Sequence, residues 1–347
     1  MQRKLKAIDF FCSGGGMSFG IQQAGIEVLA GIDIDKNCRE TYVSNINNSK
    51  FICADISNFK EKELLNYVEV NVADDNLIFI GCSPCQYWSI MRTSRSKSEK
   101  GKNLLCDFQR FVEYYKPGFI IVENVPGIFR RREESGLDIF INTIEWMGYT
   151  VKYKVLDLSY YGVPQSRKRF SLIASRTNSN IDFPEPDEIQ KTVKSVIGDK
   201  NLFPEISAGH SDQTAFLHTT PKLSDLNIKR LEMTHVDGGS RAAWSDTNLQ
   251  LETYKKNNAY FKDTYSRMYW NKPAPTITTK FYSISNGRFV HPEQNRAISL
   301  REGATLQTFP INYTFKGKSL AKIAKIIGNA VPPIYAKKLG HAIKKSL

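Results

Sequence analysis

The sequence lacks the features that mark several broad classes of protein. No apolar run approaches the roughly 18 residues that a membrane-spanning helix needs. Residues 1–6 lead into a strand-like segment rather than into the apolar core of a signal peptide. There is also no low-complexity tract and no fixed-period repeat, which argues against disorder and against a solenoid. These absences predict a folded protein of the cytoplasm.

Cysteine is scarce and unevenly placed. All 6 cysteines fall in the first third of the 347 residues, a placement that suits reduced thiols better than a disulfide framework. Cys82 and Cys85 form a C-x-x-C pair, but no second such pair or pair of histidines would complete a zinc site. We therefore expect no metal, and the thiols must serve packing or catalysis.

Acidic residues are missing from one long segment. Residues 315–347 carry eight lysines and no Asp or Glu, and the whole chain has 48 basic and 35 acidic side chains, a net charge of +13. Further basic clusters lie at 92–102, 130–132 and 167–169. Such a balance favours a polyanion as partner. A basic solvated surface would have the same composition.

The first 175 residues alternate short apolar runs with segments of helical period, which is the pattern of a mostly parallel sheet covered by helices. After residue 176 the texture becomes polar and rich in Pro and Gly, with weak periodicity to about 271, which indicates a second, smaller domain. Pro332 and Pro333 separate two predicted helices near the end of the chain, since proline does not fit inside a helix. Strands are predicted at 5–11, 27–32, 77–80, 119–122 and 170–174, and helices at 104–115, 320–327 and 334–343.

A glycine-rich turn, Ser13-Gly14-Gly15-Gly16, follows the first predicted strand. A strand, a glycine turn and a helix N-terminus let a ligand approach bare backbone. The dinucleotide pattern G-x-G-x-x-G is not met, because Phe19 stands at the third glycine position. Asp33, at the end of the second strand, is placed to accept hydrogen bonds from ribose hydroxyls. The pair indicates an adenosine-bearing cofactor, with a tight turn and a surface aspartate as the alternative.

A later strand delivers Cys82-Ser83-Pro84-Cys85 to its carboxyl end, where α/β proteins bind ligands. Three interpretations compete: a redox pair, half of a zinc site, or a single nucleophile with an incidental neighbour. The zinc site lacks its other half, and a redox pair would normally lie near the start of a domain of about a hundred residues. We favour Cys85 as a lone nucleophile and Cys82 as a packing residue.

The next predicted strand ends in Glu123-Asn124-Val125. Adjacent parallel strands would bring Glu123 close to Cys85, where a carboxyl group screened from water can hold a proton near neutrality. Gln165, Arg167 and Arg169 precede another strand, and alternate arginines on one face could grip a phosphate, a carboxylate or a pyrimidine carbonyl. An N-cap carboxylate and a basic turn are the structural alternatives.

Taken together, these segments resemble the cytosine-5 DNA methyltransferases of bacterial type II restriction-modification systems, and the likeness runs in order through nearly the whole chain. Residues 9–20 are similar to the family's cofactor loop, and Ser83-Pro84-Cys85-Gln86 to its nucleophile motif. The remaining matches are Glu123-Asn124-Val125, Gln165-x-Arg167-x-Arg169, residues 296–310 and Gly328-Asn329-Ala330-Val331-Pro332-Pro333.

The resemblance implies an α/β fold, with a Rossmann-like S-adenosylmethionine-dependent methyltransferase sheet and a smaller, irregular target-recognition domain. The catalytic domain is expected to comprise residues 1–175 and 311–347, and the small domain residues 176–310, with a target-recognition region at about 177–271 that 296–310 help to hold. The implied cofactor is S-adenosyl-L-methionine, which leaves as S-adenosyl-L-homocysteine. By position, the expected cofactor contacts are Phe11, Ser13, Gly14, Gly16, Asp33, Ile34, Asp55, Ile56, Pro84, Leu104, Asn329 and Ala330.

The resemblance also implies a sequence-specific reaction on DNA. The enzyme flips a cytosine out of the duplex, adds the Cys85 thiolate at ring carbon 6 and transfers a methyl group to ring carbon 5. Glu123 is expected to donate or share a proton at ring nitrogen 3, and Arg167 to steady the pyrimidine carbonyl. The residues expected to complete the catalytic pocket are Pro84, Asn124 and Arg169.

Contacts with DNA are expected in two parts of the chain. The basic, polar residues 89–103 follow the nucleophile and are predicted to form a lid that orders on DNA. In the variable region, Arg241 and Arg267 could read guanine edges, contact phosphates or be plain loop residues. The expected DNA contacts are Ser89, Arg92, Arg95, Gln165, Arg241 and Arg267.

The implied partner is double-stranded DNA, with a cognate restriction endonuclease encoded nearby and no stable complex with it. A monomer in the bacterial cytoplasm, associated with the nucleoid, is expected. The same chemistry on transfer RNA is one alternative, and a catalytically silent DNA-binding regulator is another. The presence of Cys85, Glu123 and Arg167 argues against the silent regulator, and the failed glycine pattern argues against a nicotinamide oxidoreductase.

Overall fold

The computed structural model describes residues 4–84, 103–251 and 262–347. Contacts within it divide the chain into two compact units. The large unit comprises Met1–Tyr161, Lys168–Pro186 and Ala330–Leu347, and the small unit comprises Gly162–Arg167 and Asp187–Asn329. In the described part of the chain, no helix has the length and apolar character needed to cross a membrane.

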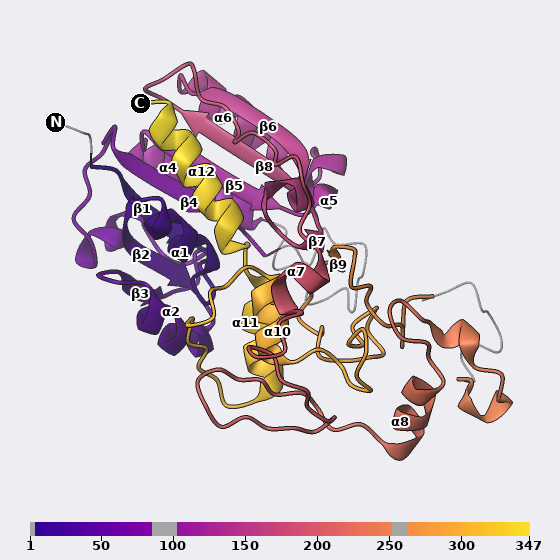
Figure 1. Ribbon diagram of the computed structural model, residues 1–347. Helices are drawn as coiled ribbons and strands as arrows, with labels where there is room; N and C mark the ends of the chain where they lie inside the picture. Colours follow the sequence, from indigo (N-terminus) through magenta and orange to yellow (C-terminus); the bar gives the residue numbers. More distant parts are fainter. Residues whose placement is uncertain (1–3, 85–102, 252–261) are drawn as a thin grey trace. The chain divides into compact units, whose positions relative to one another are not determined.

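A seven-stranded sheet forms the centre of the large unit, with the strand order β3-β2-β1-β4-β5-β8-β6 (Figure 1). The first five strands of the chain pair in parallel, whereas β8 is antiparallel to both β5 and β6. The predicted α/β class is therefore confirmed. The strands are β1 Lys6–Phe10, β2 Glu27–Asp33, β3 Lys50–Cys53, β4 Leu77–Gly81, β5 Phe119–Asn124, β6 Thr150–Asp157 and β8 Lys168–Ser175.

Two of these strands were not predicted. β3 is only four residues long, and β6 exposes the lysines at 152 and 154, so neither is a continuous apolar run. Both are edge strands of the sheet. The central strands β1, β4 and β5 are covered on both faces and are apolar throughout most of their length, which is why the sequence reveals them.

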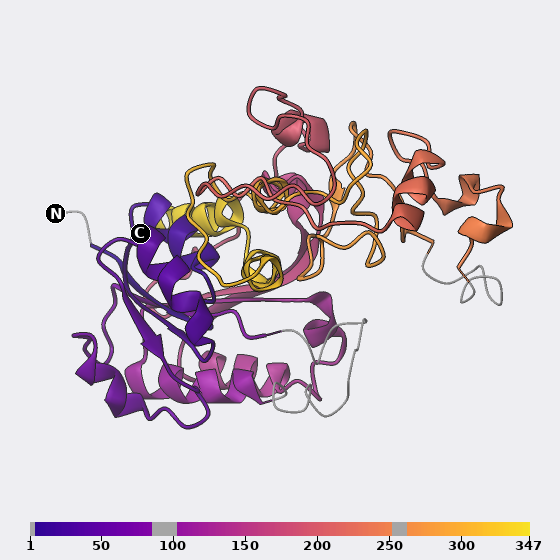
Figure 2. The ribbon, with the colours of Figure 1, turned by 90° about the horizontal axis from the view of Figure 1, so that it is seen from below.

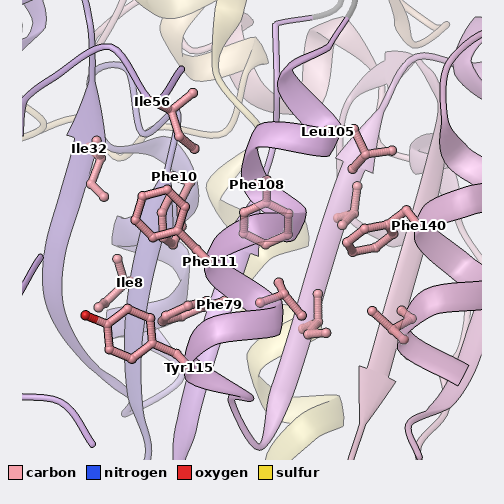
Figure 3. Packing of buried hydrophobic residues seen from close by; sticks show 14 of the residues in the cluster. Ile8, Phe10, Ile32, Ile56, Phe79, Leu105, Phe108, Phe111, Tyr115 and Phe140 are labelled. Atoms are coloured by element: carbon pink, nitrogen blue, oxygen red, sulfur yellow. The ribbon is translucent and has the colours of Figure 1, made fainter. Parts of the chain in front are cut away.

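Helices cover both faces of this sheet, with α1 and α12 on one side and α4 and α6 on the other (Figure 2). The core under α4 is built from aromatic rings, and the Phe10 ring centroid lies 5.2 Å from that of Phe108 and 5.0 Å from that of Phe111 (Figure 3). The predicted helix at 104–115 is confirmed. The helices of the large unit are α1 Gly16–Gln23, α2 Arg39–Asn45, α4 Leu104–Tyr115, α5 Pro126–Arg130, α6 Leu137–Trp146 and α12 Pro333–Lys345.

The last helix, α12, belongs to the large unit although it lies far along the chain. A Cβ atom at Gly20 of α1 would lie 2.2 Å from the Pro333 carbonyl oxygen and 2.5 Å from the Ala336 Cβ. Glycine at this position therefore allows the two helices to pack at short range. α12 begins at Pro333 rather than one residue later as predicted, since the first helical position needs no backbone N–H.

The small unit has little regular structure in its described residues, 162–167, 187–251 and 262–329. Its elements are α7 Val193–Ile197, α8 Asp225–Glu232, α10 Leu300–Leu306, α11 Leu320–Asn329, and the two-residue strands β7 Gln165–Ser166 and β9 Ala274–Pro275. A separate apolar cluster that includes Leu231, Trp244 and Tyr265 supplies a core. The polar composition after residue 176 is consistent with this irregular architecture.

The two units differ from the expected domain boundaries in three segments. Residues 176–186 continue the large unit, residues 162–167 belong to the small unit, and 311–329 belong to the small unit rather than to the large one. The last difference has a physical cause, because α11 packs against α10 and the Gln307 side chain donates a hydrogen bond to the Ile327 carbonyl at 3.0 Å.

Candidate active site

The predicted site residues of the large unit gather at one edge of the sheet. β1 to β5 are parallel, and the segments that contain these residues end the strands or follow them directly, at 11–16, 33–34, 55–56, 83–84 and 123–124. The carboxyl ends of parallel strands share an edge, which is where open α/β sheets bind ligands. The fold thus brings five separate stretches of sequence to one side of the large unit.

The turn after β1 has an unusual backbone. Phe11 and Ser13 have positive φ angles of 66° and 47°, and Gly15, the N-cap of α1, has φ 92°. No side chain caps this helix. The Ser13 N–H donates to Asp33 Oδ2 at 2.8 Å, so the turn is tied to the end of β2. Left-handed backbone at non-glycine residues is typical of functional sites.

The ends of β2 and β3 combine polar and apolar groups. Asp33 Oδ1 accepts the Asp35 N–H at 2.8 Å, and a carboxylate oxygen can accept more than one hydrogen bond. The neighbouring Ile34 is 65% exposed, an unusual position for a large apolar side chain. Asp55 is half-buried, and Ile56 is buried in the core, so a cofactor contact from Ile56 would come from its backbone.

The remaining predicted cofactor contacts differ in their surroundings. Leu104 is half-buried at the first position of α4 and packs against the core of the large unit. Gly14 and Gly16 are buried, and Pro84 is exposed. Asn329 ends α11 in the small unit, while Ala330 begins the last segment of the large unit. These contacts stay predictions.

The loop after β4 is held by Asn124. The Asn124 side chain donates to both the carbonyl and the hydroxyl oxygen of Ser83, each at 3.1 Å. Burial raises the pKa of the Cys82 thiol well above its usual value, so this thiol stays neutral, in keeping with a packing role. Cys85, Ser89, Arg92 and Arg95 lie outside the described residues, as does most of the predicted lid.

Glu123 is buried at the end of β5 and faces a positive charge. It is 6% exposed, and its Oε1 atom lies 3.1 Å from the Arg169 Nε atom. The contact is an ion pair rather than an aligned hydrogen bond, because Oε1 has no hydrogen-bond partner. Asn124 and Glu123 alternate along the strand and so point to opposite faces of the sheet. Within the large unit, Arg169 is therefore the arginine that contacts the predicted acid.

The structure contradicts the predicted DNA contact of Gln165. This side chain is fully buried in the small unit and donates to the Leu306 carbonyl at 2.8 Å and to Gln307 Oε1 at 2.6 Å. Its own Oε1 accepts the Ile277 N–H at 2.9 Å. Gln165 is therefore an internal link of the small unit. Arg167, also in this unit, is 3% exposed, and its Nη1 lies 3.4 Å from the Ile277 carbonyl oxygen.

Arg267, one of the residues offered for reading bases, contacting phosphates or forming a plain loop, also lies inside the small unit. Arg267 is 2% exposed, and all three of its guanidinium nitrogens donate within the small unit. Arg241 is buried as well, at 5% exposure, so it does not present a guanidinium to the surface. The acceptors of the Arg267 guanidinium are the carbonyls of Leu231, Thr234, His291 and Gln294 and the side chain of Asn295.

Sequence reasoning missed one titratable group beneath the glycine turn. Asp9, in β1, is fully buried, and burial raises its pKa to about 7. Its Oδ2 accepts the Ser18 hydroxyl at 2.6 Å, while Oδ1 has no hydrogen-bond partner. An aspartate between Ile8 and Phe10 in an apolar strand was the available signal.

Comparison with known proteins identifies the family. The model of the C-5 cytosine-specific DNA methylases matches residues 5–345. The chain belongs to this family. It is 38% identical over 346 residues to Type II methylase M.HgiDII of Herpetosiphon aurantiacus, covering 98% of this chain and 95% of that protein. It is 30% identical to Type II methyltransferase M1.HphI of Haemophilus parahaemolyticus, with 98% and 87% covered.

Solved structures agree with this C-5 methylase at the level of the fold. A protein encoded within an Escherichia coli prophage superposes with a TM-score of 0.75 at 21% identity, covering 99% of each chain. The Entamoeba histolytica methyltransferase EhMeth gives a TM-score of 0.65 at 15% identity, covering 99% of this chain and 98% of that one. The Rossmann-like sheet expected from the sequence is therefore confirmed.

Proposed function

We propose that this C-5 methylase methylates carbon 5 of a flipped cytosine in double-stranded DNA, at the carboxyl edge of the β1 to β5 sheet. The observation that carries the proposal is the buried pair of Glu123 and Arg169, on strands beside the Asn124-braced loop that leads to Cys85. A buried carboxyl group next to a nucleophile loop can serve as a proton donor in base chemistry.

The large unit offers groups that fit S-adenosyl-L-methionine. Asp33 presents a carboxylate for ribose hydroxyls, the exposed Ile34 offers an apolar surface for adenine, and the glycine turn at 13–16 leads into the uncapped first turn of α1. When bound, this cofactor supplies an electrophilic methyl group on a sulfonium centre. Within the large unit, the predicted contacts of Asp55, Leu104 and Ala330 would complete the site.

The side chains of this protein would act on the base. The Cys85 thiolate adds to ring carbon 6, which makes carbon 5 electron-rich, and Glu123 shares a proton with ring nitrogen 3. Arg169 holds the Glu123 carboxyl through its charge. Once carbon 5 carries the methyl group, its proton leaves to water and the bond from carbon 6 to the Cys85 sulfur breaks, which restores the aromatic ring.

The biological setting is proposed from the relatives. Both curated relatives carry Type II names, which supports a protective role in a restriction-modification system. The cognate endonuclease would be encoded nearby without forming a stable complex, and the methylase would act as a monomer on DNA at the nucleoid. The small unit would supply target recognition through residues other than Gln165 and Arg267, whose polar groups bind within the unit.

Transfer of labelled methyl from S-adenosylmethionine tests this proposal. The wild type is given unmethylated genomic DNA or transfer RNA, and the modified positions in DNA are read by bisulfite sequencing. We expect label in DNA at one short motif, no label with Cys85→Ser, and wild-type label with Cys106→Ser, which changes an exposed thiol on α4. Label in transfer RNA alone, or full activity of Cys85→Ser, would contradict it.

A further inference from the structure

The last helix places a phenol on the face of the sheet that carries Glu123. Tyr335 in α12 is fully buried, and its hydroxyl donates to Ser171 Oγ in β8 at 2.7 Å. Ser171 is 1% exposed. Burial raises the pKa of Tyr335 above its usual value, so this group stays a protonated donor throughout the physiological range. The hydrogen bond therefore joins two elements that lie 164 residues apart in the sequence.

Ser171 is the direct cross-strand neighbour of Glu123. In the antiparallel pairing of β5 with β8, Glu123 lies opposite Ser171, and Asn124 lies opposite Phe170. Side chains that face each other in such a pair project to the same side of the sheet with Cβ atoms about 5 Å apart. Arg169 is two residues before Ser171 and shares that side, where it contacts Glu123.

In the part of the chain that the structure describes, one donor and one acceptor of this cluster make no hydrogen bond. The Ser171 hydroxyl oxygen accepts from Tyr335, and among the described residues the Ser171 hydroxyl donates to no acceptor. Directly opposite, Glu123 Oε1 is a buried acceptor without a hydrogen-bond partner. A buried donor and a buried acceptor that both lack a hydrogen bond cost free energy until they bond to each other. The other ionisable groups near this cluster are Arg169, the neutral Cys82 thiol and Tyr161, whose ring centroid lies 5.8 Å from that of Tyr335.

We propose that Tyr335 and Ser171 are positioning residues for Glu123. Tyr335 occupies the acceptor side of the Ser171 hydroxyl and so directs the Ser171 proton toward Glu123 Oε1, while Arg169 holds the same carboxyl through its charge. The second carboxyl oxygen, Oε2, is then left to share a proton with the base. This inference rests on the proposed role of Glu123 as the acid of the reaction.

The test compares two tyrosines of the large unit. Tyr335→Phe removes the hydroxyl next to Ser171, whereas Tyr149→Phe removes another buried hydroxyl, which donates to the Pro117 carbonyl at 2.5 Å, before the start of β5 and away from Glu123. Both variants lose one buried hydrogen bond, so a general structural effect would be shared. The relay is the chain of hydrogen bonds from Tyr335 through Ser171 to Glu123. Ser171→Ala removes its middle hydroxyl, and Ser171→Thr keeps a hydroxyl at that position.

The first readout is the single-turnover rate of methyl transfer as a function of pH. We expect Tyr335→Phe and Ser171→Ala to lower the rate about tenfold and to shift its pH profile, as for a misplaced proton donor. KM for DNA should stay within about twofold, because no binding group is removed. Tyr149→Phe should keep the wild-type profile, and Ser171→Thr should recover most of the rate. Equal profiles for Tyr335→Phe and Tyr149→Phe would overturn the inference while leaving the proposed function in place.

The second readout does not need activity. In protein labelled with ¹³C at the glutamate side-chain carboxyl, the Glu123 signal is assigned by its loss in Glu123→Gln. We expect this signal to move in Tyr335→Phe and Ser171→Ala but not in Tyr149→Phe. An unmoved signal in the first two variants refutes the relay even if the wild type transfers no methyl group, whereas an inactive wild type with a moved signal refutes only the proposed function.

Discussion

The two units satisfy their buried backbone groups in different ways. In the large unit, strand pairing across a seven-stranded sheet does this, and apolar rings such as Phe10 and Phe108 fill the space against α4. The small unit has little regular structure, and buried arginines donate to its backbone carbonyls instead. Arg267, Arg296 and Arg301 are among the largest fully buried side chains of the described residues. An irregular chain thus needs long, multidentate donors where a sheet needs none.

Helix starts show the same contrast. In the small unit, three helices begin with an N-cap side chain that accepts a hydrogen bond from a backbone N–H of the first turn. These side chains are Thr192 for α7, Ser224 for α8 and Ser299 for α10. α1, α4, α5 and α6 of the large unit begin without one. Helices that pack on a sheet gain their stability from that packing, whereas short helices in an irregular unit depend more on local caps.

The largest effect is expected from Arg267→Met. The substitution keeps the apolar stem but removes the donor to five acceptors, so the small unit should lose about 3–5 kcal/mol of stability. Hydrogen exchange of each unit would locate the loss. Lys280→Met, at an exposed position of the same unit, is the control and should change stability by less than about 0.5 kcal/mol. Similar exchange for the two variants would mean that the buried arginine is dispensable.

Asp9 should make the large unit less stable as the pH rises. Its pKa is raised from 3.8 to about 7 in the folded protein, so the folded state holds more protons than the unfolded state between these values. The stability that protonated Asp9 contributes is fully present below about pH 4. It is lost, by about 4 kcal/mol, as the pH rises through 7. Urea unfolding of Asp9→Asn against wild type from pH 4 to pH 8 measures this difference, and parallel curves would exclude it.

Glu302 should give the small unit the opposite dependence. The charge of Arg296, bound through both carboxylate oxygens at 2.7 Å, lowers the pKa of Glu302 from 4.5 to about 2 against the opposing effect of burial. The stability that the pair contributes is present above about pH 4.5 and is lost, by about 3 kcal/mol, as the pH falls through 2. Hydrogen exchange should show acid loosening the small unit in the wild type. Glu302→Gln should lack that dependence, and retention of it would assign the effect to other groups.

The smallest effect concerns the caps. Thr192→Ala removes the acceptor for the Ser195 N–H at 3.3 Å and should cost the small unit about 1 kcal/mol. Asn103 precedes α4 without a side-chain cap, so Asn103→Ala should be close to neutral. Thermal unfolding compares the two substitutions. Equal shifts in melting temperature for the two variants would show that the small unit depends on its helix caps no more than the large unit does.

The sequence predicted the parts of the fold that depend on local pattern. Strands such as β4 and β5 and the helix α4 carry clear periodicity, and residues at the ends of parallel strands follow from that topology. Gln165 was misassigned because its partners lie 141 and 142 residues away, and polar side chains in a loop are ordinarily solvated. The contact of Arg169 with Glu123 and the bond of Tyr335 to Ser171 depend on an antiparallel register and on α12, which no local pattern reveals.

The discontinuity of the large unit sets an order of events during translation. Ribosomes complete β8 and then the whole segment Asp187–Asn329 before the residues of α12 emerge. Until then α1 lacks the helix that packs against Gly20, and Ser171 lacks its hydrogen bond from the Tyr335 hydroxyl. The nascent chain must hold a half-covered sheet while a second unit forms, which favours chaperone binding at that stage. A circular permutant that starts with α12 ahead of β1 would remove this delay.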